Sequence, residues 1–126
     1  MIAFDRQEAL RYLGYRNTQP DTAVADSLAR CAAELQAAVQ PKSVFAAFPL
    51  SHPAEHTLEI AGVTIRSENL SRNLKGCEQV YLMAATLGIA ADRLIARASA
   101  VRMSDAVLYQ AAAAAMIETY CDEVND

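Results

Sequence analysis

Apolar residues in the first third of the chain recur at steps of three and four, which places them on one face of a helix. The members of this stripe are Val24, Leu28, Cys31, Leu35 and Val39. Asp21 can accept a hydrogen bond from a free amide of the first turn, and Pro41 cannot continue a helix. We therefore predict a helix between these two residues. A shorter helix is predicted from Asp5 through Leu13, with Gly14 in the left-handed position after its end.

The middle of the chain carries the pattern of strands. Residues 43–50 form a short apolar run, and Pro49 places the end of this strand near an edge or a bulge. Thr57–Ile60 and Val63–Arg66 flank a turn of two residues, Ala61 and Gly62. Such a turn lets the apolar side chains of both strands share one face. We therefore predict a half-buried hairpin with its polar side chains on the other face.

A second strand region follows a short helix, which Ser67 can cap and Gly76 can end. The run 80–85 is almost continuously apolar and shows no alternation. This pattern predicts a strand that is covered on both faces and is therefore central in its sheet. Residues 86–88 would then turn the chain into a helix of about 12 residues.

The last helix is predicted to begin with Ser104 as its cap and to reach about Glu123. Its alanines at 111–115 have small side chains, so another element can approach closely. The predicted order is two helices, three strands, a helix, a strand and two helices, without regular strand–helix alternation. This order indicates an α+β fold with a mixed or largely antiparallel sheet of about four strands and helices packed on it.

Length and composition indicate one globular domain over residues 1–126. Hydrophobic residues make up 53% of the chain and charged residues 21%, which suits a packed core and not a disordered segment. The net charge of −4 argues against general electrostatic binding to nucleic acid or to anionic membranes. Charged side chains interrupt the alanine-rich helix, so it is not expected to span a membrane.

The three cysteines, Cys31, Cys77 and Cys121, lie far apart, and no pair has the spacing of a zinc knuckle or a redox motif. Dispersed cysteines of this kind suit reduced, buried thiols in a cytoplasmic protein. The first residues lack a basic region followed by an apolar one, so no signal peptide is expected. We therefore expect the protein in the cytoplasm.

Two histidines are the first candidates for chemistry. His52 and His56 lie four residues apart, with Glu55 and Glu59 beside them. On a helix, histidines at this spacing can share a metal ion. Pro53 lies between them and a strand follows, so a solvated loop is the favoured interpretation.

Two carboxylates on the last helix are the second candidates. Glu118 and Asp122 share one face of that helix, and paired carboxylates can transfer protons or hold a metal. A solvated helix end is the simpler interpretation, and an enzyme that uses both residues is the weakest of our functional hypotheses.

Three further motifs have simple structural interpretations. Residues 86–88 could present free amides to an anion, but one glycine is not a phosphate loop and turn formation explains it. Lys75 lies close to Cys77 and could lower the pKa of a thiol, but the predicted strand favours an inert buried cysteine. Residues 11–15 are explained as a helix end.

Three segments together resemble one known family. They are EALRYLGY at 8–15 with Pro20-Asp21 after it, LKGCEQVYLMAATLG at 74–88, and the alanine-rich helix that ends IETYCDE at 117–123. In this order they are similar to the stand-alone relatives of the activation domain of cobalamin-dependent methionine synthase. The resemblance covers most of the chain, and the middle segment is its most specific part.

The resemblance implies an α+β fold with a bent antiparallel sheet and a role in corrinoid-dependent methyl transfer. In that family the domain binds S-adenosylmethionine and presents it to oxidised cobalamin after a flavodoxin-like partner has supplied one electron. The partner implied for this chain is a cobalamin-dependent methionine synthase or a related corrinoid methyltransferase. Cobalamin itself would be bound only through that partner.

The chain departs from the family pattern at its ligand site. The family's adenosylmethionine loop, Arg-x-x-x-Gly-Tyr, lies after the alanine-rich helix, whereas the sequence stops at Asp126. Arg11 to Tyr15 is one residue shorter and lies on the first helix, so the ligand role is not carried onto it. Glu118 is the one position that matches a ligand-side acid. We therefore expect a chain that corresponds to the first half of a longer family member, either as a natural short form or as a fragment.

Two functional hypotheses rank above the enzyme that would use Glu118 and Asp122. The first is an accessory or partner protein for a corrinoid methyltransferase that is not an enzyme on its own. The second is a small interaction domain, a homodimer, that keeps the fold without the ligand. The second hypothesis predicts an exposed apolar face on the alanine-rich helix and no pocket lined by charged residues.

Overall fold

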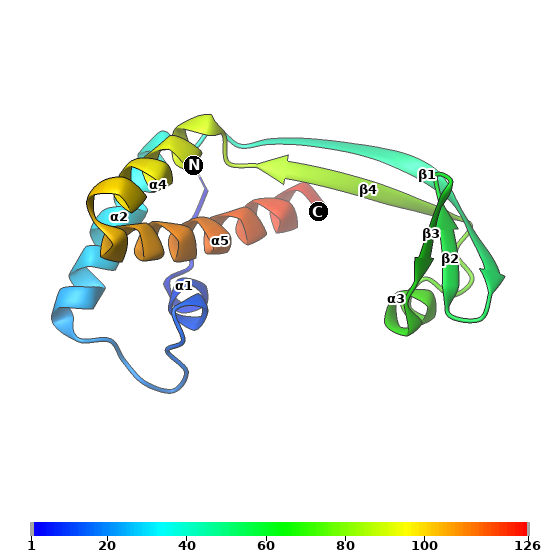
Figure 1. Cartoon of the computed structure of the whole chain (residues 1–126), viewed down its shortest axis with the longest axis horizontal. Helices are drawn as coiled ribbons and strands as arrows, with labels where there is room; N and C mark the ends of the chain where they lie inside the picture. Colours follow the sequence, from blue (N-terminus) through cyan, green and yellow to red (C-terminus); the bar gives the residue numbers. More distant parts are fainter. Residues whose placement is uncertain (1, 126) are drawn as a thin grey trace. The chain divides into compact units, whose positions relative to one another are not determined.

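The computed structural model describes residues 2–125; Met1 and Asp126, the ends of the predicted domain, lie outside the described residues. Residues 2–125 form five helices and four strands (Figure 1). The helices are α1 Arg6–Tyr12, α2 Thr22–Ala38, α3 Glu68–Asn73, α4 Ile89–Val101 and α5 Met103–Asn125. The strands are β1 Lys42–Ala54, β2 Thr57–Ile60, β3 Val63–Arg66 and β4 Gln79–Thr86. This is the element order predicted from the sequence, and the α+β class is confirmed.

The four strands form one antiparallel sheet in the order β3-β2-β1-β4. The chain divides into two compact units. The helical unit comprises the residues up to Ser43 together with those from Ala85 onward, and the sheet unit is Val44–Ala84. The boundaries fall inside β1 and β4. The predicted organisation as one domain over residues 1–126 stays a prediction.

The helical unit begins its first two helices where the sequence predicts. Asp5 accepts a hydrogen bond from the Glu8 amide at 3.1 Å, and Asp21 accepts one from the Val24 amide at 2.9 Å. These side chains satisfy amides that have no partner inside the helix. The apolar stripe of α2 faces the core, where Leu28, Cys31 and Leu35 are buried. Burying one leucine stabilises the fold by about 1.5–3 kcal/mol.

Helix α5 is the central element of the helical unit, because it packs against α1, α2 and α4. Its buried face consists largely of alanines, and Ala112 and Ala115 are almost completely buried. The small side chains allow the close approach that the sequence predicts. Ser104 was predicted as the N-cap, but α5 begins at Met103, so Ser104 lies inside the first turn.

The sheet unit contains the predicted hairpin. β2 and β3 pair in the expected register, with Ile60 opposite Val63 and Leu58 opposite Ile65. The buried residues Leu50, Leu58 and Ile60 form a small core, against which α3 packs with its apolar side chains. Ser67 caps α3 as predicted, since its hydroxyl oxygen accepts from the Leu70 amide at 3.1 Å.

Strand β1 is longer than the predicted 43–50 and does not end at Leu50. It runs on to Ala54 and lies between β2 and β4. Leu50 pairs with Ile60, so Pro49 falls opposite the hairpin turn, beyond the end of β2. Proline has no N–H to donate, but no residue of β2 lies opposite it, so the sheet loses no hydrogen bond there. A bulge between Ser51 and Ala54 accommodates Pro53.

Strand β4 contradicts the prediction of a central strand that is covered on both faces. It lies at the edge of the sheet, and Tyr81, Leu82 and Met83 are exposed. Missing alternation shows that apolar side chains point to both faces, but it does not show that anything covers them. Cys77, predicted to be buried at the start of this strand, is also exposed.

Candidate functional site

Glu118, the residue predicted to face a ligand, lies on the exposed side of α5 next to α1. The Tyr12 hydroxyl donates a hydrogen bond to Glu118 Oε1 at 2.5 Å. The Arg11 guanidinium lies 5.0 Å from the centre of the Tyr12 ring, and Arg11 Nε donates to Glu8 at 2.9 Å. We call these four residues the Tyr12–Glu118 cluster. It joins the end of α1 with the last third of α5. Residues 11–15 and Glu118 were separate candidates in the sequence.

The polar groups of this cluster are hydrogen-bonded to one another. The hydrogen bond to Glu118 raises the pKa of Tyr12, because that bond requires the protonated phenol. The hydrogen bond to Glu8 raises the pKa of the Arg11 guanidinium. Glu118 is therefore engaged with Tyr12, and no hydrogen bond or ion pair among the described residues joins it to Asp122. The cluster offers one cation and two carboxylates at an exposed surface.

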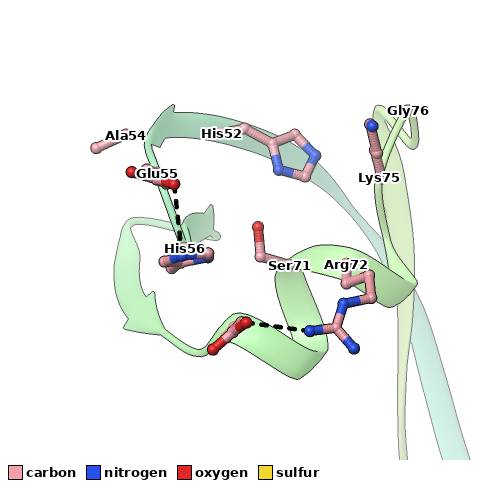
Figure 2. Close-up of a pocket in the computed structure, with 9 residues that line it drawn as sticks. His52, Ala54, Glu55, His56, Ser71, Arg72, Lys75 and Gly76 are labelled. Atoms are coloured by element: carbon pink, nitrogen blue, oxygen red, sulfur yellow. Dashed lines mark hydrogen bonds and ion pairs between the residues drawn. The ribbon is translucent and has the colours of Figure 1, made fainter.

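The two candidate histidines lie at the rim of one pocket in the sheet unit, which we call the His52 pocket. Its volume is about 440 Å³. Its lining residues are His52, Ala54, Glu55, His56, Glu68, Ser71, Arg72, Lys75 and Gly76. They come from the end of β1, the turn to β2, α3 and the loop after α3. Figure 2 shows the Ser71 hydroxyl pointing into the space between His52 and His56.

Four side chains of the His52 pocket contact one another in two pairs. His56 Nε2 lies 3.6 Å from Glu55 Oε1, and Arg72 Nη2 donates to Glu68 Oε1 at 3.1 Å (Figure 2). Within residues 2–125, no group of three or more His, Cys, Asp or Glu side chains could hold a metal ion. All lining residues except Ser71 are exposed, so water and salt screen the charges. The pocket is a polar surface hollow that does not exclude water.

A third cluster, which the sequence analysis missed, lies in the helical unit. Tyr109 on α5 is buried, and its hydroxyl donates to Glu34 on α2. Arg30, one turn earlier on α2, lies 3.1 Å from Asp105 and 3.5 Å from Glu34. We call these four residues the Tyr109 network. The spacing of Arg30 and Glu34 was its one signal in the sequence, because side chains four apart on a helix are neighbours.

Burial raises the pKa of Tyr109 to about 12, and the hydrogen bond to Glu34 acts in the same direction. Burial also raises the pKa of the adjacent Cys31 thiol. Both groups are therefore held in their neutral forms. The network ties α2 to α5 and holds no activated nucleophile.

We expect this network to make the fold sensitive to alkaline pH. The folded pKa of Tyr109 lies above the usual tyrosine value of 10.0, so its stabilisation is complete below pH 10 and is lost as the pH rises to about 12. The loss amounts to about 3 kcal/mol, since one pKa unit corresponds to about 1.4 kcal/mol. The measurement is urea unfolding between these pH values, for the wild type and Tyr109→Phe. The variant is expected to lose less stability across this window; equal losses would refute the assignment.

The turn at residues 86–88 is closed by its own hydrogen bonds. The Gly88 amide donates to Thr86 Oγ1 at 3.1 Å, and the Gln40 amide donates to the Leu87 carbonyl at 2.8 Å. The Gly88 amide therefore already has an acceptor within the turn. This agrees with the structural interpretation of the turn.

Comparison of the chain with protein-family models, with curated proteins and with solved structures finds no match. The resemblance to the methionine synthase activation domain therefore stays a prediction. Among residues 2–125, no helix is both long enough and apolar enough to cross a membrane.

Proposed function

We propose that this protein is a cytoplasmic accessory or partner of a cobalamin-dependent methionine synthase or a related corrinoid methyltransferase. It would support reactivation of that enzyme without catalysing a reaction on its own. The proposal rests on the resemblance of the three segments, in order, to the activation-domain family. The observation that carries it is the hydrogen bond between Tyr12 and Glu118, because it brings the first and the last of these segments together.

The charges of the Tyr12–Glu118 cluster suit part of the ligand that the resemblance implies. S-adenosylmethionine carries an ammonium group, a carboxylate and a sulfonium centre. Glu118 and Glu8 could accept hydrogen bonds from the ammonium group, and Arg11 could pair with the carboxylate. The cluster would hold only the amino-acid end, and the ligand would have to compete with Tyr12 for Glu118.

A calorimetric titration with S-adenosylmethionine tests this role of the cluster. We expect Glu118→Gln to weaken binding about tenfold or more, because a charge-assisted hydrogen bond contributes about 1.5–3 kcal/mol. Asp122→Asn is the matched control: it removes an exposed acid one turn further along α5, and it should leave the affinity unchanged. Equal losses in both variants would point to net charge and not to a site.

Co-purification with a corrinoid methyltransferase tests the partner role. If S-adenosylmethionine did not bind, the partner role would be the only one left. If no such enzyme were retained either, the proposal would be refuted.

The second candidate function is an interaction domain that keeps the fold as a homodimer without a ligand. One expected sign was an exposed apolar face on the alanine-rich helix. The alanines do not form that face, because Ala111, Ala112 and Ala115 are buried in the helical unit, whereas Met103 and Val107 near the start of α5 are exposed. The other expected sign, the absence of a pocket lined by charged residues, is contradicted by the His52 pocket, whose lining includes acidic and basic side chains. A larger group of exposed apolar side chains lies on β1 and β4, and this observation favours keeping the second candidate.

A further inference from the structure

The most unusual surface of the molecule lies on two neighbouring strands of the sheet unit. Five large apolar side chains are exposed there: Val44 by 71%, Phe45 by 66%, Tyr81 by 68%, Leu82 by 46% and Met83 by 40%. Single exposed apolar residues are common, but a contiguous group of this size usually marks an interaction site.

The exposed side chains lie on both faces of the strands. Phe48 and Val80 pack against the small core beside α3, which identifies the inner face of β1 and β4. Because successive side chains point to opposite faces, Leu82 lies on the inner face, beyond the side chains of that core. Tyr81 and Met83 lie on the outer face. A partner that covered one face alone would leave the other exposed.

The free edge of β4 is open to pairing with another strand. The eight residues from Gln79 to Thr86 contain no charge, no proline and no glycine, so β4 lacks the features that usually protect an edge. The Glu78 carbonyl accepts from the Leu50 amide at 2.9 Å and therefore points toward β1. Backbone groups alternate in direction along a strand, so those of Gln79, Tyr81 and Met83 point outward.

We propose that β4 pairs antiparallel with β4 of a second copy of this chain, about a twofold axis through Leu82. In this register Leu82 meets Leu82 of the second copy, and Tyr81 lies opposite Met83 of the second copy. Residues with outward-pointing backbone groups then face each other, as the hydrogen bonds of the ladder require. Both pairs of Tyr81 and Met83 place an aromatic ring beside a thioether, a favourable cross-strand contact.

Charge favours a second copy as the occupant. Self-pairing of a strand without charges brings no like charges together, and the strand offers no charge that would select an acidic or basic partner. In this register Tyr81, Leu82, Met83 and the backbone of the β4 edge contact the second copy. Val44 and Phe45 lie on β1, on the other side of β4 from that edge.

Cross-linking at the proposed twofold axis tests the register. Leu82→Cys is made in a chain that carries Cys77→Ser and Cys121→Ser, so that the native exposed or half-buried thiols cannot react. In this register Leu82 and Leu82 of the second copy form a pair without mutual hydrogen bonds. The Cα atoms of such a pair lie about 4.5 Å apart, a distance that a disulfide can bridge. We expect a covalent dimer on mild oxidation. Val63→Cys in the same background, on the opposite edge of the sheet, should stay largely uncross-linked. Equal cross-linking at both positions would overturn the proposal.

Light scattering at micromolar concentration, without any methyltransferase or S-adenosylmethionine, measures the association itself. We expect twice the mass of the chain for the wild type, and about a hundredfold weaker association for Tyr81→Lys, since each dimer loses two aromatic contacts. Val63→Lys is the control and should stay dimeric. A monomeric wild type, or a dimer unaffected by Tyr81→Lys, would overturn the proposal. A monomeric wild type that retained a corrinoid methyltransferase through β4 would do so as well, while leaving the proposed function intact.

Discussion

Replacing Gly88 by alanine is expected to lower the free energy of unfolding by about 3 kcal/mol or more. Gly88 has φ 98° and ψ 162°, a backbone conformation that residues other than glycine essentially never adopt. A Cβ atom there would also lie 2.9 Å from the carbonyl oxygen of Gln40 and 3.3 Å from its nitrogen. The Gln40 amide is held by its bond to the Leu87 carbonyl, so neither backbone can withdraw without breaking that bond.

Gly14→Ala is the matched control for this substitution. Gly14 has a similar φ of 93°, but no atom lies within 4 Å of a Cβ built there. It should therefore cost only the backbone strain, about 1–2 kcal/mol. Urea unfolding of both variants measures the difference. If the two variants lost equal stability, the close approach between Gly88 and Gln40 would contribute nothing.

The parts of the fold that the sequence predicted correctly depend on residues close together in the chain. Asp5 and Asp21 cap helices because their partners lie three residues further on. The hairpin register follows from the length of its turn and from the pattern of its two strands. In these places, short-range chemistry is sufficient to decide the structure.

The errors lie where the outcome depends on distant residues. The run 80–85 showed that apolar side chains face both ways, but burial depends on which elements cover them, and β4 lies at an edge. Pro49 interrupts nothing, because the register with β2 places it opposite a turn. The same dependence explains why Cys77 is exposed and not buried.

The candidate site shows the same division between short-range and long-range information. The segment around Tyr12 and the acid Glu118 were each singled out from the sequence. Their hydrogen bond joins residues 106 positions apart, and no local pattern contains that information. The Tyr109 network joins α2 to a residue 75 positions away and was missed for the same reason. Residue types at such sites can be noticed in the sequence, but their pairing follows only from the packing of the helices.

Replacing Leu58 by alanine is expected to destabilise the sheet unit selectively. Leu58 is completely buried, and only Leu50 and Ile60 are buried with it in that core. Removing a buried leucine side chain costs about 2–5 kcal/mol, and such a small core has few contacts to compensate. We therefore expect faster amide hydrogen exchange in Val44–Ala84, with the protection of the helical unit retained, because local opening follows the weakest packed region.

Leu35→Ala and Val63→Ala separate this effect from general destabilisation. Leu35 is equally buried, but in the core of the helical unit, so its loss should accelerate exchange in α2 and α5 first. Val63 is exposed on β3, and its replacement should change stability by less than about 0.5 kcal/mol. If Leu58→Ala and Leu35→Ala accelerated exchange equally in both units, the chain would unfold as one cooperative domain over its whole length. Selective acceleration would mean that each unit depends on its own core, with Leu58 essential to the strands that carry the exposed apolar edge.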